Sequence, residues 1–169
     1  MSKNLLTIQL DRRSRELLSK IGNHAGSLNL KNSFNSIGRQ YRKEVSLIFA
    51  RKQVRQPNLK WPDLTERTKI DKAKKGFGSK GILERTGELR RSMTSRSSSD
   101  NISTIGKNFG VFGSSNKYGN YHDNVKGSRK KIPLRNFSIP SQSTYGVFLR
   151  IIEEDIGEQL KYLGVKIDR

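Results

Sequence analysis

The strongest constraint on the fold is an apolar stripe between residues 30 and 49 of this 169-residue chain. Apolar side chains recur there at steps of three and four residues, the spacing of one face of an α-helix. The stripe consists of Leu30, Phe34, Ile37, Tyr41, Val45, Ile48 and Phe49. Basic residues lie mostly off it, and Pro57 breaks the helical pattern. The pattern predicts a helix from about residue 30 to 54 whose apolar face belongs to the core and not to a cofactor site.

Shorter patterns on both sides of this stripe predict a mixed α+β fold. Before it, alternation of apolar and polar residues from Leu6 to Leu10 predicts a strand, which a short helix follows. After it, we expect two short helices, an antiparallel β-meander rich in Ser and Thr, and a closing amphipathic helix. The expected ranges are 11–22, 65–75 and 82–91 for the short helices, 92–99, 101–105 and 109–112 for the meander, 118–122 for a helical turn, 132–139 for a further strand and 144–163 for the last helix. Its expected inward residues are Val147, Phe148, Ile151, Ile152, Ile156 and Leu160. Residues 1–169 show no internal repeat and are interpreted as one domain.

Charge narrows the classes of partner. The chain carries 34 Lys and Arg against 15 Asp and Glu, a formal net charge of +19. Such a field attracts polyanions, so nucleic acid is the first partner to consider, an acidic protein the second and an anionic membrane a weak third. A solvated basic surface is the alternative that needs no partner. The charge is uneven, because residues 151–169 carry five acidic and three basic side chains.

Composition also excludes several classes of protein. The chain has no cysteine, which excludes disulfides and thiolate metal sites. No apolar run approaches the ~20 residues of a membrane span, and residues 1–10 lack the apolar region of a secretion signal. We therefore expect no membrane association and a protein that stays in a cytoplasm or an assembly.

The glycines at positions 76, 78 and 81 match the spacing of a dinucleotide-binding loop. A lysine-rich helix end precedes them, however, where that motif requires a hydrophobic strand. We therefore interpret residues 72–81 as a flexible basic loop, and residues 123–131 as a second one. The basic side chains expected to face neighbouring subunits, DNA or both are Lys72, Lys74, Lys75, Lys80, Lys126, Arg129, Lys130 and Lys131.

Aromatic residues flank the second basic loop. Tyr118, Tyr121 and Phe137 could stack on the bases of a single strand, since aromatic faces beside cations bind single-stranded nucleic acid. The alternative, which we favour, is that these aromatics are core residues beneath the loop.

Catalytic groups are sparse. His122 and Asp123 could be half of an acid–base or metal site, but neither a second histidine nor an acidic cluster lies nearby in the sequence. The set Asp63, Glu66, Lys69 and Asp71 is compatible with a nuclease-like group, and equally with a capped, salt-bridged helix. We therefore expect no enzymatic activity, and we assign no catalytic, cofactor-binding or metal-binding residue.

Motifs that follow one another between residues 61 and 137 carry a family resemblance. They are Trp-Pro-Asp-Leu-Thr at 61–65, Thr-Gly-Glu-Leu-Arg-Arg-Ser-Met at 86–93, Val-Phe-Gly-Ser at 111–114, Tyr-Gly-Asn-Tyr-His at 118–122 and Ile-Pro-Leu-Arg-Asn-Phe at 132–137. In this order they resemble the phage virion morphogenesis (tail-completion) proteins of tailed bacteriophages. The resemblance covers about half of the chain.

The resemblance implies a structural neck subunit without an active site. Such a subunit is expected to form a ring of identical copies, hexameric by analogy, around the DNA channel between the head connector and the tail terminator or tail tube. It would be assembled in the host cytoplasm and reside in the virion. The residues expected to maintain this scaffold are Trp61, Leu64, Leu83, Gly87, Leu89, Tyr118, His122, Arg135 and Phe137.

The last helix suggests how copies would meet. Glu153, Glu154, Asp155 and Glu158 form an acidic patch that we expect to dock against a basic face of the adjacent subunit. The alternative function is a stand-alone basic module that binds DNA or RNA. A third possibility, a small metal-dependent nuclease, requires carboxylates that converge on His122.

Overall fold

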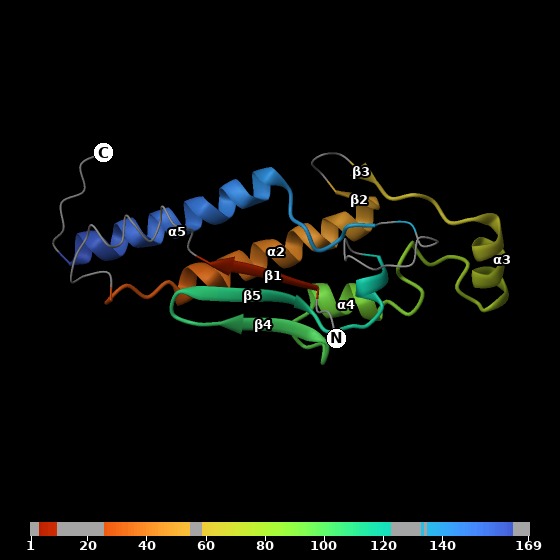
Figure 1. The fold of residues 1–169 in the computed structure, drawn as a ribbon, viewed down its shortest axis with the longest axis horizontal. Helices are drawn as coiled ribbons and strands as arrows, with labels where there is room; N and C mark the ends of the chain where they lie inside the picture. The colour runs from red at the N-terminus through yellow and green to blue at the C-terminus, as the bar shows by residue number, and fades with distance from the viewer. Residues whose placement is uncertain (1–3, 10–25, 55–58, 123–132, 134, 164–169) are drawn as a thin grey trace.

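The structure is a computed structural model that describes residues 4–9, 26–54, 59–122, 133 and 135–163. In this part of the chain, two long helices and one short helix pack with a small antiparallel sheet, while a further short helix lies at one end (Figure 1). The mixed α+β fold predicted from the sequence is therefore confirmed. No helix in the described ranges is long and apolar enough to cross a bilayer.

Helix α2 (Lys31–Arg51) forms the centre of the core. It follows the predicted stripe, and every member of the stripe is buried. The helix ends where Lys52 adopts a left-handed conformation and its N–H bonds Ile48 O, a common way to terminate a helix. Gly38 brings α2 against the sheet, because a Cβ there would lie 2.5 Å from the Phe112 ring.

Among the described residues, the main sheet has three antiparallel strands. The strands are β1 (Asn4–Gln9), β4 (Asn101–Ile105) and β5 (Phe109–Ser114), in the order β1-β5-β4. Phe112 of the central strand pairs with Leu6 on one side and Ser103 on the other. A separate pair of two-residue strands, β2 (Gln53–Val54) and β3 (Leu59–Lys60), follows α2.

The predicted meander is wrong in its first strand. Residues 92–94 belong to helix α4 (Glu88–Thr94), and residues 95–100 form turns. The third strand of the sheet is instead β1, from the start of the chain. The prediction took the alternating Ser residues as the polar face of a strand. Ser92 instead faces the interior of the protein, where it donates to Leu89 O (2.8 Å) and accepts from the Ser114 hydroxyl (2.7 Å).

The other short elements agree only in part with the sequence. Helix α3 (Glu66–Lys74) was predicted, and its cap Thr65 accepts a hydrogen bond from Thr68 N. The helix predicted at 82–91 begins only at Glu88, because Leu83 and Gly87 have positive φ angles of 61° and 74°. The 3-10 turn η2 (Gly119–Tyr121) matches the predicted helical turn. In the range predicted as a strand at 132–139, the described residues 135–139 form neither strand nor helix.

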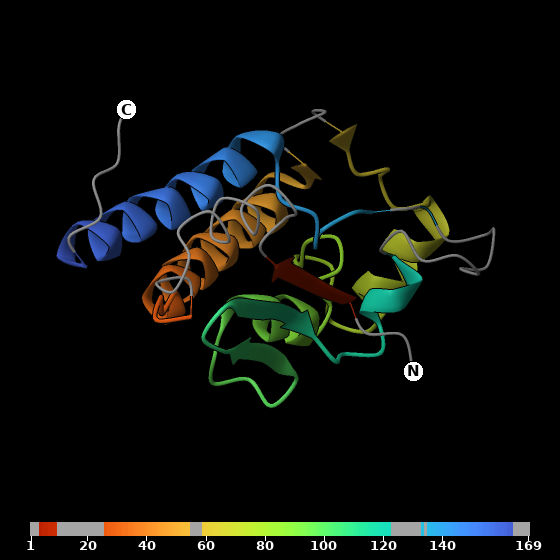
Figure 2. The ribbon, with the colours of Figure 1, turned by 60° about the vertical axis from the view of Figure 1, so that its left-hand side comes forward.

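Helix α5 (Gln142–Tyr162) packs beside α2, with Ser141 as its cap. It buries Phe148, Ile152 and Leu160 as predicted, whereas Val147 remains 40% exposed. Figure 1 and Figure 2 show α2 between α5 and the sheet, while α4 lies against the sheet next to α2. The helix predicted at 11–22 lies outside the described residues, as does Leu10.

Candidate functional site

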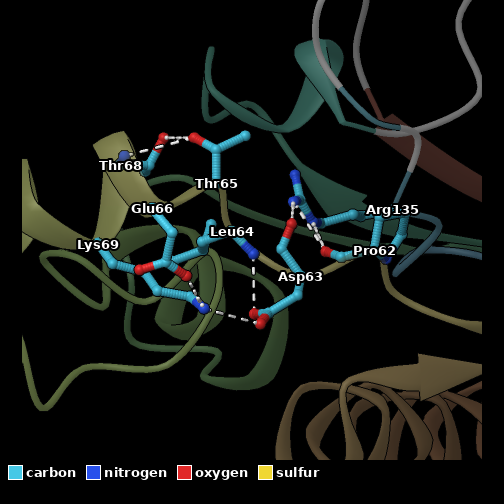
Figure 3. Close-up of polar contacts among 8 residues, drawn as sticks. All are labelled: Pro62, Asp63, Leu64, Thr65, Glu66, Thr68, Lys69 and Arg135. Carbon is cyan, nitrogen blue, oxygen red and sulfur yellow. Dashed lines mark hydrogen bonds and ion pairs between the residues drawn. The ribbon is translucent and has the colours of Figure 1, made fainter.

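Two of the motif segments, 75 residues apart in sequence, join at one point of the fold. The Trp61 indole donates to Asn136 O over 2.9 Å. The Arg135 guanidinium donates through Nε (3.1 Å) and Nη2 (2.9 Å) to Pro62 O, and more weakly through Nη2 (3.4 Å) to Asp63 O (Figure 3). These bonds fasten the chain before α3 to the chain before α5. We call this set of residues, Trp61 to Asp63 and Arg135 to Phe137, the motif junction.

Arg135 suits this position because its guanidinium is a planar fork of donors that stays charged. Only 4% of the residue is exposed. Burial lowers the pKa of the guanidinium from its ordinary value, and the negative charge of Asp63 opposes that change. The carbonyl oxygens of Pro62 and Asp63 place partial negative charge next to Nε and Nη2 of the guanidinium.

Aromatic packing anchors the motif junction to the end of α2. The Trp61 ring meets the Phe49 ring edge-on at a centroid distance of 5.4 Å, and the Phe137 ring lies 5.7 Å from the Phe49 ring. Burying a large apolar side chain stabilises a fold by about 1.5–3 kcal/mol. Trp61, Leu89 and Phe137 are core residues, and Leu64 and Leu83 pack against the core from its edge. The predicted scaffold role of these five residues fits this packing.

His122 supports the junction through its main chain. Its carbonyl accepts from Arg135 N over 2.7 Å. Its half-buried imidazole has an Nδ1 without a hydrogen-bond partner among the described residues. Burial first, and then the positive charge of Arg135, lower the pKa of His122 from 6.5, while a bond with the Pro133 backbone opposes them. Both effects favour the neutral form of the imidazole.

The described residues do not assemble a cluster of metal ligands. Among them, no group of three or more His, Asp or Glu side chains converges in metal-binding geometry. Asp123, the sequence neighbour considered as a partner of His122, lies outside the described residues.

The carboxylates near the start of α3 form ion pairs instead. Lys69 Nζ lies 3.2 Å from Asp63 and 2.7 Å from Glu66, all at exposed positions (Figure 3). The Leu64 N–H bond and then Lys69 lower the pKa of Asp63, and Glu66 and then Asp63 raise the pKa of Lys69. Of the two interpretations of this sequence pattern, the capped and salt-bridged helix is the one observed.

The prediction that Lys72 faces outward is wrong. The residue is only 8% exposed, and its ammonium donates to Lys80 O (2.8 Å) and Gly81 O (2.9 Å). Lys72 therefore connects the end of α3 to the far end of the glycine-rich loop, residues 76–81. Burial lowers the pKa of the Lys72 ammonium. Lys72 and Lys74 lie in the last turn of α3 and not in the loop.

Of the remaining predicted basic residues, Lys74, Lys75 and Lys80 are exposed. Lys75 pairs with Asp71 at 2.8 Å. The other four, Lys126, Arg129, Lys130 and Lys131, lie outside the described residues.

The glycine-rich loop also lacks the arrangement of a nucleotide cradle. Such a cradle points successive backbone N–H groups at phosphate. Here the N–H groups of Gly76, Phe77 and Lys80 donate to carbonyls of the same protein. The Arg85 guanidinium also covers the Phe77 ring at 5.1 Å.

Two aromatics that we expected in the core are on the surface. Tyr118 is 52% and Tyr121 48% exposed, whereas Phe137 is fully buried. The two tyrosines are three residues apart, with Tyr118 as the cap of the 3-10 turn and Tyr121 as its last residue. The Lys117 ammonium lies 5.4 Å from the Tyr118 ring. Their place in a glycine-containing turn is the sequence signal that favoured exposure.

The acidic patch of α5 is smaller than predicted. Glu153, Glu154 and Glu158 are exposed. Asp155 instead faces α2, where it accepts hydrogen bonds from the Ser33 hydroxyl and from Gln159 Nε2. Gln159 in turn bonds the main chain of Asn29 (2.8 and 3.0 Å), so these polar residues join the two long helices.

No protein-family model matches this chain, and neither a curated protein nor a solved structure matches it. The resemblance to phage tail-completion proteins therefore stays a prediction that depends on the motifs and their order.

Proposed function

We propose that this protein is a structural subunit of the neck of a tailed-phage virion. In this role it completes the tail, or joins it to the head connector, as one copy in a ring around the DNA channel. The observation that carries the proposal is the motif junction. The residues behind the resemblance, Trp61, Arg135 and Phe137, bond main-chain carbonyls or pack in the core, as scaffold residues do.

The distribution of charge supports contacts between copies. Exposed lysines at the α3 end of the molecule contrast with three exposed glutamates on the C-terminal half of α5, at the opposite end (Figure 1). A surface of one sign that meets a different surface of the other sign gives a heterologous, head-to-tail contact. Such contacts close into a ring when the rotation between copies permits. The partners above and below the ring would be the connector and a tail protein, with genomic DNA in its channel.

Electron microscopy and native mass measurement of the purified full chain test this proposal. We expect closed rings of one copy number at moderate salt. The triple variant Glu153→Lys/Glu154→Lys/Glu158→Lys should lose them, because it turns the acidic patch basic. A matched control, Glu66→Lys/Asp71→Lys/Glu88→Lys, adds the same charge on α3 and α4 and should retain the rings. A wild-type protein that stays monomeric at all concentrations contradicts the proposal.

A stand-alone nucleic-acid-binding module is the second candidate. The exposed pair Tyr118 and Tyr121, beside Lys117, favours it. Monomers that bind oligonucleotides tightly at physiological salt, without rings, would support this function over the first. Rings with weak affinity for oligonucleotides would support the neck subunit.

A further inference from the structure

A groove of about 270 Å³ lies between α2 and α5. Helix α2 contributes Lys43, Glu44 and Leu47 to its walls, and α5 contributes Ser143, Thr144 and Val147. Neither the motifs nor the acidic patch of α5 includes any of these residues.

Glu44 is the unusual member of this lining. It is only 8% exposed, and its Oε1 has no hydrogen-bond partner among the described residues. A buried carboxylate oxygen that lacks a donor is unfavourable, because that oxygen has lost water without a replacement. A donor from another molecule would remove this cost.

The rest of the lining suits a cation on an aliphatic stem. The hydroxyls of Ser143 and Thr144 bond Ser141 Oγ at 3.0 and 2.9 Å, and each hydroxyl oxygen still has capacity to accept. Leu47 and Val147 offer apolar surface, on which the methylene groups of Lys or Arg can lie. Lys43 also lines the groove, but it is exposed, so water screens its repulsion of an incoming cation.

The groove and the acidic patch lie along the same face of α5. Ser143, Val147, Glu154 and Glu158 are spaced by four, seven and four residues, so they share one face of α5. Arg150 interrupts this face, so the groove and the glutamates are two separate acceptors on one side of the molecule.

We propose that this groove receives a guanidinium or ammonium group from a second copy of the chain, with Glu44 as its acceptor. The inference rests on the proposed ring. The chain itself is a source of such groups, because its 34 Lys and Arg exceed its 15 Asp and Glu. Glu44 thus decreases the stability of the monomer and increases that of the assembly.

The variant Glu44→Gln tests the inference, because glutamine keeps the shape and removes the charge. We expect its monomer to melt at the same or a higher temperature than wild type, while the dissociation constant of the assembly rises at least tenfold. The control Glu66→Gln, which removes one charge at an exposed position on α3, should change neither quantity. Val147→Trp, which fills the groove from α5 at a half-exposed position, should also weaken assembly.

Three results would overturn this inference, and they differ in what they say of the ring. If wild type assembles and Glu44→Gln assembles equally well, the groove takes no part and the proposed function stands. If the Glu44→Gln monomer melts at a lower temperature than the wild-type monomer, both at a dilution where neither assembles, Glu44 has a structural role within the monomer. If wild type remains monomeric, the proposed function fails, and with it the inference about a second copy.

Discussion

At the scale of single residues, the motif junction depends on main-chain acceptors. Arg135 has no carboxylate bonded to its guanidinium among the described residues; its bonds go to the carbonyls of Pro62 and Asp63. The sequence indicated that Arg135 would form local hydrogen bonds, but it could not identify the acceptors. Carbonyl groups are the same in every residue, so no side-chain pattern marks which ones a distant arginine will reach.

We predict that Arg135→Met lowers the free energy of unfolding by about 1–3 kcal/mol, because it removes the part-buried hydrogen bonds of a charged donor to the carbonyls of Pro62 and Asp63. Arg135→Lys should lose part of this amount, since an ammonium cannot reproduce the fork. Urea unfolding measures both changes. Arg150→Met, at an exposed position on α5, is the matched control and should stay within about 0.5 kcal/mol of wild type. Equal stability of Arg135→Met and wild type would show that the junction contributes little.

His122 provides a prediction about pH. Because its folded-state pKa is lowered from 6.5, the folded protein binds a proton there less readily than the unfolded chain. The contribution of neutral His122 is therefore fully present above pH 6.5 and decreases as the pH falls through 6.5 towards the lowered pKa. We expect the unfolding free energy to fall over this window in wild type, and to fall less in His122→Gln. Parallel pH profiles of the two proteins would contradict this assignment.

At the scale of elements, the sequence predicted the long helices well and the short elements poorly. Helices α2 and α5 each bury one apolar face, so the spacing of apolar residues in the sequence follows directly from which side of the helix is buried. Residues 92–99 alternate like a strand, yet Ser92 and Met93 are buried in a helix through contacts with β5 and α2. In so short a segment, tertiary contacts decide the structure, and the local pattern does not contain them.

The start of α4 gives a prediction at this scale. Gly87 has φ +74°, a conformation that costs other residues about 1–2 kcal/mol. Gly87→Ala should therefore destabilise the protein by about that amount, although no atom lies within 4 Å of the added Cβ. Gly146→Ala, in α5 with equally open space, should instead stabilise it by about 0.5–1 kcal/mol through helix propensity. Thermal unfolding should show shifts of opposite sign, and shifts of the same sign would refute the backbone argument.

At the scale of the whole molecule, the elements place different chemistry at the two ends. Figure 1 and Figure 2 show η2 and α3 towards one end, and the C-terminal part of α5 towards the other. The sequence indicated the excess of positive charge and the acidic last helix. It could not indicate that Lys72 faces inward, that Asp155 faces α2, or that Glu44 Oε1 has no donor in the part of the chain that the structure describes. Each of these depends on packing between segments that are distant in sequence or on a turn whose geometry the residues alone do not specify.

The nucleic-acid-binding module, our second candidate, would use two kinds of contact at the end of the molecule that holds η2 and α3. Lysines bind phosphate and release counterions, so they set the salt dependence of binding, whereas aromatic rings stack on bases without changing it. We expect Lys74→Gln/Lys80→Gln to reduce the slope of log affinity against log salt for oligothymidine by about 1.4, from about 0.7 for each lost phosphate contact. Tyr118→Leu/Tyr121→Leu should leave that slope unchanged.

If the protein is the nucleic-acid-binding module, the tyrosine variant should instead weaken binding to the single strand about tenfold or more, because stacking contributes about 1–3 kcal/mol per base. Its affinity for a duplex should not change, since paired bases are already stacked on one another. Fluorescence anisotropy across a salt series measures the salt slopes of both variants and the affinities of the tyrosine variant for the single strand and the duplex. If the tyrosine variant binds the single strand as wild type does, then Tyr118 and Tyr121 face a protein partner instead. That result would favour the ring over the nucleic-acid-binding module, because exposed aromatic pairs are typical of the contact surfaces between protein subunits.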